Sequence, residues 1–427
     1  MKISDLHTLF LNCNTICTDT RSVKENDLFF ALKGDQFNGN VFVAKALESG
    51  AKYAVIDEQD YHIEGKTLLV KDVLETLQSL AGYHRDYLNI PIIALTGSNG
   101  KTTTKELINA VLSQKYATTA TVGNFNNHIG VPLTLLTMNS NTEIGIVEMG
   151  ANHLKEIEFL CAIAKPNFGY ITNFGKAHLE GFGSIQGVIQ GKSELYTFLK
   201  ETQGLAFINN KDSKQIDLTS DLITIAFGDH TVEAKTTINL EDADPFVSVE
   251  FNTMHIQSQL IGTYNFTNIS AAITIGTYFE VEDKNIKIAI EGYTPTNNRS
   301  QIITKGSHKI ILDAYNANPT SMKAALESFH VLKDSNKIAI IGDMFELGED
   351  ALKEHQSIVD LVSTLNINQV ILIGKLFKTT KTVSEHIKSF DSFETFKETL
   401  NQLNISHATL LIKASRGMKL ERILDLI

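Results

Sequence analysis

A glycine-rich segment, Leu95 to Thr104 (LTGSNGKTTT), constrains the fold of this chain more than any other feature. The apolar run at 90–95 suits a buried parallel strand, and residues 105–112 carry apolar side chains at helical spacing. A strand, a glycine turn and a helix form the context of a phosphate-binding loop, where backbone N–H groups and a helix N-terminus face one anion. The segment therefore predicts binding of a nucleoside triphosphate.

Individual residues of this loop have expected roles. Lys101 would reach the β- and γ-phosphates, and the Thr102 hydroxyl would bind Mg²⁺. Only Ser98 and Asn99 separate the two glycines, a shorter spacing than the usual pattern, so a plain surface turn is the alternative interpretation. The residues expected to bind ATP are Gly97, Ser98, Asn99, Gly100, Lys101, Thr102 and Thr103.

Composition excludes several classes of protein. A net charge of −11 without a long basic run argues against nucleic acid or an anionic membrane as a partner. We find no signal peptide and no apolar run long enough to span a bilayer. The three cysteines cannot form a disulfide framework, and no His/Cys cluster has zinc-site spacing. We therefore expect a cytoplasmic protein.

The 427 residues allow two or three domains, and breaks in the pattern favour three. We expect a small N-terminal α/β domain (1–88), a central ATP-binding domain with a mostly parallel sheet (89–300) and a C-terminal Rossmann-like domain (301–427). Beyond residue 300, apolar runs alternate with helical segments, as in an α/β fold with a mostly parallel sheet. These runs are 309–313, 337–341, 369–373 and 408–412.

Three charged residues of the central domain follow apolar runs or lie in a helix. Glu148 ends the run at 143–148, where a carboxylate beside a phosphate loop suits Mg²⁺, although such acids are also common caps. His178 lies in a glycine-rich loop beyond the next strand end, where a metal contact, a phosphate contact and a structural role all fit. Lys192, within a helix expected at 184–200, reads from these patterns alone as a surface lysine.

Amide side chains are concentrated near these positions. Asn126 and Asn127 lie in a loop nearly free of charge, which either orients a carboxylate or phosphate or is an ordinary loop. Asn265 and Asn268 are three residues apart, so they share one helix face and could contact a base or phosphate. Capping is the alternative for Asn265.

The loops after the C-terminal strands form a third candidate region. Ligands of parallel sheets bind at the carboxyl ends of the strands, so we expect a cleft wall there, with an ordinary Rossmann-like surface as the alternative. The loops are 313–319, 342–348, 374–375 and 413–419. The candidate substrate-binding residues in them are Tyr315, Asn316, Asn318, Ser415 and Arg416.

Taken together, these motifs resemble the Mur ligase family, ATP-dependent enzymes that form amide bonds in peptidoglycan synthesis. The shortened phosphate loop is similar to that family's form of the motif. The stretches 173–184, 313–322 and 342–348 resemble the branch that adds D-alanyl-D-alanine. Ligases that add the third residue of the stem usually carry a Tyr-Ala-His-Thr-Pro type of sequence where this chain has Tyr-Asn-Ala-Asn-Pro at 315–319. Ala414 departs from the glycine expected before Ser415.

The resemblance implies further roles. Glu148 and His178 would belong to the magnesium site, and Lys192 would be carbamylated and help to hold a second Mg²⁺, which replaces its surface interpretation. Uridine recognition would lie in residues 1–88, with Ser22 and Asn38 as candidates. The residues implied to approach ATP, some of them only when the domains close, are Asn265, Asn268, Arg299 and Asp313.

The implied reaction joins two small molecules. The terminal carboxylate of UDP-N-acetylmuramoyl-tripeptide attacks the γ-phosphate of ATP to give an acyl phosphate, which the amine of D-Ala-D-Ala then attacks. One alternative is a sister ligase that adds a single amino acid such as diaminopimelate, lysine or glutamate. Another is a P-loop ATPase or nucleotide switch without ligase activity, which would not need residues 301–427. We expect a monomer.

Overall fold

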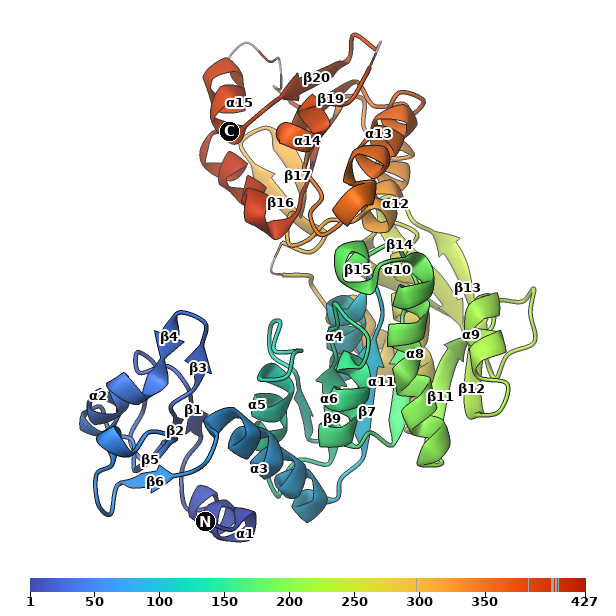
Figure 1. Cartoon of the computed structure of the whole chain (residues 1–427). Helices are drawn as coiled ribbons and strands as arrows, with labels where there is room; N and C mark the ends of the chain where they lie inside the picture. Colours follow the sequence, from blue (N-terminus) through green and yellow to red (C-terminus); the bar gives the residue numbers. More distant parts are fainter. Residues whose placement is uncertain (297, 383, 401–402, 404, 406) are drawn as a thin grey trace.

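The computed structural model describes residues 1–296, 298–382, 384–400, 403, 405 and 407–427. It contains three α/β domains in chain order, each built on its own main sheet (Figure 1). The N-terminal domain (blue) and the C-terminal domain (orange to red) both adjoin the central domain (Figure 1). The predicted fold class is therefore confirmed.

The N-terminal domain has a parallel sheet in the order β1-β2-β5-β6 and a small hairpin, β3-β4. Residues 27–34 contribute to two strands, because the buried Leu28–Phe30 joins the sheet whereas the exposed Lys33–Gly34 pairs in the hairpin. The strands are β1 (Ile16–Cys17), β2 (Leu28–Phe30), β3 (Lys33–Gly34), β4 (Phe37–Asn38), β5 (Tyr53–Ile56) and β6 (Thr67–Leu69). The helices are α1 (Ile3–Phe10), η1 (Gly39–Phe42), α2 (Val43–Glu48) and η2 (Gln59–Tyr61).

Helix α3 (Val73–Leu88) leads into the central domain. The Asp72 side chain caps it by accepting a hydrogen bond from the Glu75 backbone N–H at 2.8 Å. Its apolar face, including Leu77 and Leu80, is fully buried in a cluster shared with the central domain. The helix packs against α5 (Gly130–Thr137) and α6 (Glu156–Ala164), so it attaches the N-terminal domain to the central one.

The central sheet has the order β15-β14-β13-β12-β11-β10-β7-β9-β8, parallel from β8 to β13 and antiparallel beyond. Its strands are β7 (Ile92–Thr96), β8 (Thr118–Ala120), β9 (Ile144–Glu148), β10 (Phe168–Ile171), β11 (Leu205–Asn209), β12 (Ile223–Gly228), β13 (Thr236–Asp242), β14 (Phe246–Phe251) and β15 (Met254–Ile261). Its other helices are α4 (Lys101–Leu112), α7 (Leu179–Phe182), α8 (Ile185–Glu201), α9 (Ser213–Leu218), α10 (Asn265–Tyr278) and α11 (Asp283–Gly292).

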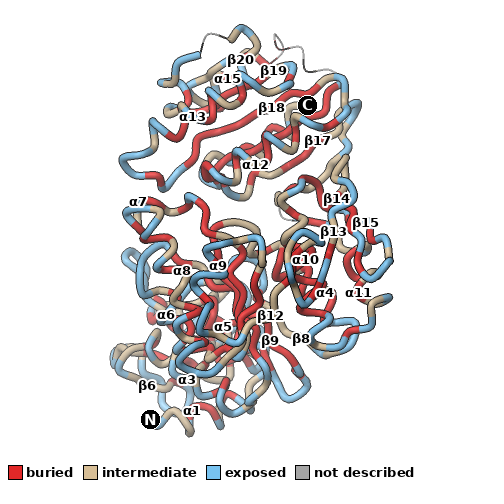
Figure 2. The backbone as a smooth tube through the Cα atoms, turned by 90° about the vertical axis from the view of Figure 1, so that its right-hand side faces the viewer, coloured by how far each residue is buried: buried red, intermediate tan, exposed pale blue. Residues whose placement is uncertain are grey.

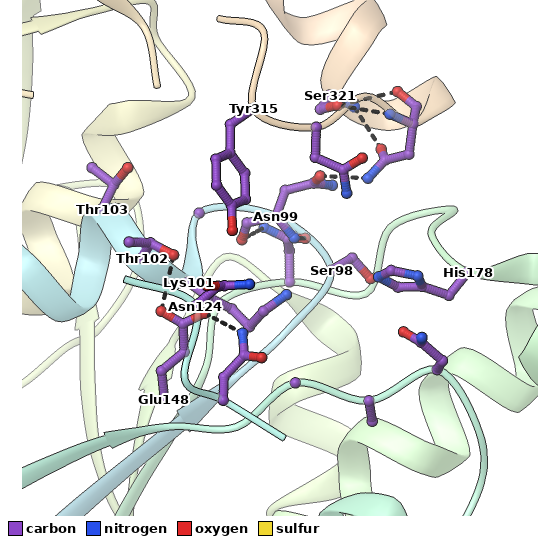
Figure 3. A pocket seen from close by; sticks show the side chains of 18 of the residues that line it. Ser98, Asn99, Lys101, Thr102, Thr103, Asn124, Glu148, His178, Tyr315 and Ser321 are labelled. Carbon is purple, nitrogen blue, oxygen red and sulfur yellow. Dashed lines mark hydrogen bonds between the residues drawn. The ribbon is translucent and has the colours of Figure 1, made fainter. Parts of the chain in front are cut away.

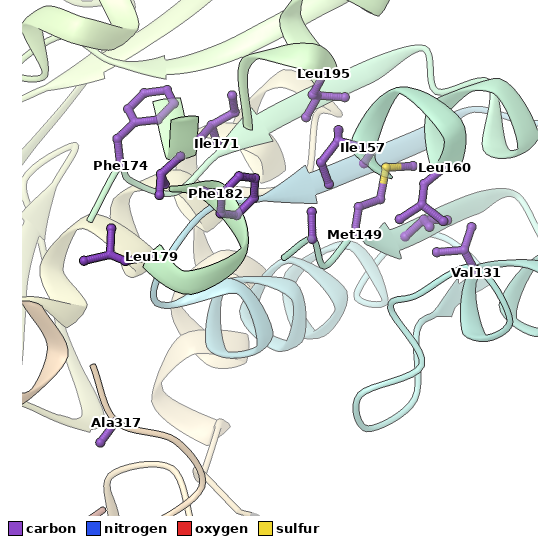
Figure 4. Packing of buried hydrophobic residues seen from close by; sticks show 14 of the residues in the cluster. Val131, Met149, Ile157, Leu160, Ile171, Phe174, Leu179, Phe182, Leu195 and Ala317 are labelled. Carbon is purple, nitrogen blue, oxygen red and sulfur yellow. The ribbon is translucent and has the colours of Figure 1, made fainter. Parts of the chain in front are cut away.

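Both faces of this sheet are covered, because successive side chains of a strand point to opposite faces. From β7, Ile92 and Ala94 enter one apolar cluster, which Figure 4 shows around Met149 and Phe182. Ile93 and Leu95 enter a second cluster, which α4 and α10 cover. A strand buried on both faces explains why the run before the phosphate loop is apolar throughout.

The C-terminal sheet has the order β16-β17-β21-β18-β19-β20 and is parallel except for the pair β16–β17. The four predicted strands are present and buried (Figure 2), whereas the edge strands β16 and β20 are partly exposed and lack a continuous apolar run. The strands are β16 (Gln301–Lys305), β17 (His308–Asp313), β18 (Lys337–Gly342), β19 (Gln369–Ile373), β20 (Ile387–Phe390) and β21 (Thr409–Lys413). The helices are α12 (Pro319–His330), η3 (Gly348–Asp350), α13 (Ala351–Val362), α14 (Lys375–Lys378), α15 (Phe393–Thr399), η5 (Arg416–Met418) and η6 (Leu420–Asp425).

Candidate active site

The segment 97–100 connects β7 to α4 as the sequence predicts, and its geometry requires both glycines. Gly97 has φ of +139°, and a Cβ there would lie 2.0 Å from the Thr172 hydroxyl oxygen. Gly100 has φ of +81°, and a Cβ there would lie 2.7 Å from Asn268 Oδ1. The loop therefore lies tightly between the end of β10 and the first turn of α10, and the Asn268 side chain leaves room only for glycine at position 100.

Glu148 lies at the carboxyl end of β9, beside the start of α4. One of its carboxylate oxygens accepts a hydrogen bond from the Thr102 hydroxyl at 2.9 Å (Figure 3), and the other accepts one from Asn126 Nδ2 at 2.8 Å. A hydroxyl and one carboxylate suit Mg²⁺, which typically takes one or two protein carboxylates together with substrate phosphates. The residues therefore fit the predicted ion, although no cluster of three or more His, Cys, Asp or Glu suited to a metal occurs among the described residues.

Lys101 is turned back over the loop, where its Nζ donates a hydrogen bond to the Gly97 carbonyl at 2.6 Å. Desolvation lowers the pKa of Lys101, the negative charge of Glu148 opposes that shift, and the positive charge of Arg299 adds to it. An anion bound in the loop would give this ammonium a stronger partner than the carbonyl.

One cavity of about 960 Å³ opens beside the loop and is lined by all three parts of the chain, from Gln78 on α3 to Lys413 on β21. Predicted residues lining it are Ser98, Asn99, Gly100, Lys101, Thr102, Thr103, Asn126, Asn127, Glu148, His178, Asn265, Asn268, Arg299, Asp313, Tyr315, Asn316 and Asn318. The order of the central sheet brings the segments of the central domain together, and docking of the C-terminal domain adds its loops to the same cavity.

Aromatic and charged residues form the wall on the C-terminal side. The Arg299 guanidinium carbon lies 3.6 Å from the Tyr315 ring centroid, and Arg416 lies over the same ring at 5.1 Å. Lys413 Nζ lies 2.6 Å from Asp313 Oδ2. Lys413 has no predicted role, although its position at the carboxyl end of an expected strand is the signal that could have identified it.

His178 faces the C-terminal domain. Its Nδ1 lies 2.5 Å from a carboxylate oxygen of Glu346, and the hydrogen bond with His178 lowers the pKa of Glu346. Figure 3 shows His178 on the opposite side of the phosphate loop from Thr102 and Glu148. The structure therefore separates His178 from the Thr102–Glu148 pair, as two distinct metal positions would require.

Lys192 is fully buried, so the surface interpretation of this residue is wrong. Its Nζ donates a hydrogen bond to the Ala151 carbonyl at 3.0 Å and lies 5.2 Å from the Phe182 ring centroid. Burial lowers the pKa of Lys192 well below its usual value, and the charge of Lys101 lowers it further. Helical spacing from Val188 already places Lys192 on the buried face of α8.

Four predicted substrate-binding residues lie outside the lining of this cavity. Ser22 is exposed and donates a hydrogen bond to the Asp19 carbonyl, and Asn38 caps η1. Ser415 Oγ accepts a hydrogen bond from the Phe345 backbone N–H, and Arg416 is exposed. Their substrate contacts stay predictions.

Comparisons with known proteins agree with this geometry. Models of the Mur ligase family, catalytic domain, the Mur ligase middle domain, and the Mur ligase, glutamate ligase domain match residues 12–85, 95–276 and 298–416. A Bacillus subtilis protein, UDP-N-acetylmuramoyl-tripeptide--D-alanyl-D-alanine ligase, is 36% identical over 96% of this chain and 93% of its own length. This chain belongs to the Mur ligase family.

Solved structures of this family have the same fold. MurF from Acinetobacter baumannii superimposes with a TM-score of 0.88 at 28% identity, covering 99% of this chain and 98% of that one. MurF ligase from Thermotoga maritima, solved in complex with ADP, has a TM-score of 0.83 at 25% identity and covers 98% and 97% of the two chains.

Proposed function

We propose that this Mur ligase joins D-alanyl-D-alanine to UDP-N-acetylmuramoyl-tripeptide at the expense of ATP, releasing ADP and phosphate, in peptidoglycan synthesis. The Bacillus subtilis relative, similar over nearly its whole length, has the name of that activity. The observation that carries the proposal is the cavity itself, because loops of the C-terminal domain form a wall of the phosphate site. A P-loop ATPase or switch would not need that wall.

The chain's own residues would bind and orient the reactants. Lys101 and the loop backbone would hold the phosphates, and Mg²⁺, when bound at Thr102 and Glu148, would neutralise charge on them. Arg299 and Asp313 would reach the nucleotide from the C-terminal side. The tripeptide carboxylate attacks the γ-phosphorus, ADP leaves, and the dipeptide amine then displaces phosphate. A cavity lined by all three parts of the chain would limit the access of water to the activated acyl group.

Lys192 supports a second cation position in this proposal. A lysine reacts with carbon dioxide only as the neutral amine, and the lowered pKa of Lys192 favours that form. The resulting carbamate would supply anionic oxygen ligands for the second cation, whereas the unmodified Lys192 side chain would supply only a buried amine. His178 would contribute from the facing loop.

Each predicted domain has its own function in this proposal. We assign substrate binding through the UDP group to residues 1–88, with Ser22 and Asn38 as candidates, ATP binding to 89–300 and closure of the site to 301–427. We propose that the enzyme acts as a monomer. Every helix among the described residues is too short or too polar to cross a bilayer, and the three cysteines are free. We place the enzyme in the cytoplasm.

The deciding experiment measures ATP-dependent phosphate release with UDP-N-acetylmuramoyl-tripeptide, with and without D-Ala-D-Ala. Release that requires both substrates supports the proposal. Release that ignores the dipeptide would indicate a P-loop ATPase, and release with a single amino acid in its place would indicate a sister ligase.

A further inference from the structure

Two asparagines from different domains meet at the phosphate loop. Asn318 caps helix α12 of the C-terminal domain, and its Nδ2 donates a hydrogen bond to Oδ1 of Asn99, in the phosphate loop, at 2.7 Å. Asn318 is nearly fully buried, with an exposed fraction of 6%. Figure 3 shows Asn99 between the loop and the start of this helix. The pair connects the C-terminal domain directly to the residues expected to bind phosphate.

The orientation of the Asn318 amide is determined by the helix that it caps. Its Oδ1 accepts a hydrogen bond from the Ser321 backbone N–H at 2.9 Å, and its own backbone N–H donates to the Ser321 hydroxyl at 3.1 Å. This reciprocal capping box leaves only the Nδ2 end of the side chain free to face another group. Asn318 therefore presents a donor to Asn99.

A donor from Asn318 in turn determines the orientation of Asn99. Its oxygen must face Asn318, so its Nδ2 points away, and this buried nitrogen has no hydrogen-bond partner among the described residues. The Asn99 backbone cannot rotate to compensate, because its N–H donates to Asn173 Oδ1 and its carbonyl accepts from the Thr172 hydroxyl. A buried amide nitrogen without an acceptor is costly unless a ligand supplies one.

We propose that Asn318 is a positioning residue that turns the Asn99 amide so that its Nδ2 donates to the terminal phosphate of bound ATP. This inference rests on the proposed ATP site. Phosphate oxygens are acceptors only, so the opposite orientation would place the Asn99 carbonyl against a phosphate and repel it. Docking of the C-terminal domain thereby makes the loop more favourable for the triphosphate than for the diphosphate.

The test compares Asn318→Asp with Asn318→Ser in the full chain. Both replacements cap a helix well. Aspartate offers Asn99 only acceptors and so forces its amide to turn over, whereas serine is too short to reach it and leaves the amide free to rotate. We expect affinity for a non-hydrolysable ATP analogue, measured by titration calorimetry, to fall about tenfold or more with aspartate and at most about threefold with serine. Affinity for ADP should stay within about twofold in both variants.

An Asn99→Ala background separates orientation from charge. The negative charge of aspartate still acts there, but no amide remains to be turned, so Asn318→Asp should change affinity by less than about threefold. Ser392→Ala is the matched control, because Ser392 caps α15 of the same domain in another capping box, away from the lining of the cavity. It should leave affinity for the analogue unchanged.

The inference would be overturned by equal losses with aspartate and serine, by an equal loss with aspartate in both backgrounds, or by an equal loss of ADP affinity. A fall of the same size in Ser392→Ala would point to general weakening of the domain and would overturn it too. These binding measurements do not involve the amine substrate, D-Ala-D-Ala. Phosphate release that ignores D-Ala-D-Ala therefore refutes the proposed ligation and leaves this inference standing.

Discussion

Replacing Lys176 by methionine tests how the C-terminal domain is held against the central domain. Lys176 lies in the loop after β10, and its Nζ is 2.5 Å from a carboxylate oxygen of Glu354 on α13. The two partners differ in burial, since 49% of the Lys176 side chain is exposed but only 6% of the Glu354 side chain. Removing the lysine therefore leaves a nearly buried carboxylate unpaired, whereas removing the carboxylate leaves a lysine that reaches water.

The size of the effect follows from this asymmetry. Breaking a fully buried pair by removing one partner costs about 3–5 kcal/mol, and an exposed pair contributes about 0.2–1 kcal/mol. With one partner half exposed, we expect Lys176→Met to weaken docking of the domain by about 1–3 kcal/mol, which is a shift of roughly 5- to 150-fold toward open forms. Opening returns Glu354 to water, so the cost appears in the docking equilibrium rather than in unfolding.

Small-angle X-ray scattering of the nucleotide-free enzyme measures this shift. The radius of gyration should increase in Lys176→Met and change little in Glu354→Gln. In the double variant, where no charge remains buried, it should return most of the way to the value of the unchanged protein. An unchanged radius in Lys176→Met, or equal increases in the two single variants, would refute the reasoning. The melting temperature should change little in each case.

Three further predictions concern buried ionisable groups. Lys192→Ala should reduce ligation by on the order of 100-fold, with partial recovery on adding a small carboxylate; failure of every small carboxylate to restore activity would count against a carbamate. Glu148→Gln can still bond to Thr102 but removes the charge, so the Mg²⁺ concentration for half-maximal activity should rise by at least about tenfold, and an unchanged requirement would exclude this carboxylate as a ligand. His7 Nε2 lies 2.9 Å from His84 Nδ1, and burial lowers the pKa of both, with His84 lowering that of His7 further. The unfolded chain therefore binds more protons than the folded chain below about pH 6.5, so stability should rise with pH through that range. His7→Gln keeps an amide donor but does not titrate, so it should flatten the change in Tm between about pH 5 and 7. Identical slopes of Tm against pH in the variant and the unchanged protein would contradict the role of His7.

Local patterns were sufficient for much of the architecture. The buried strand β7, the start of α4 at Lys101 and the four inner strands of the C-terminal sheet follow from apolar runs and turn residues. The edge strands β16 and β20 could not be predicted in this way, because half-exposed strands have no continuous apolar run. The split of 27–34 into two strands depends on pairing with the hairpin partner, which periodicity does not contain.

Local sequence is enough to place a phosphate loop between a buried strand and a helix, with polar loops after the strands of a second α/β domain. Both are properties of neighbouring residues, so local sterics and periodicity decide them. Only the three-dimensional structure shows that Glu346 lies against His178 and that Asn318 meets Asn99. Contacts between residues of different domains depend on sheet order and domain docking, and no local pattern encodes either.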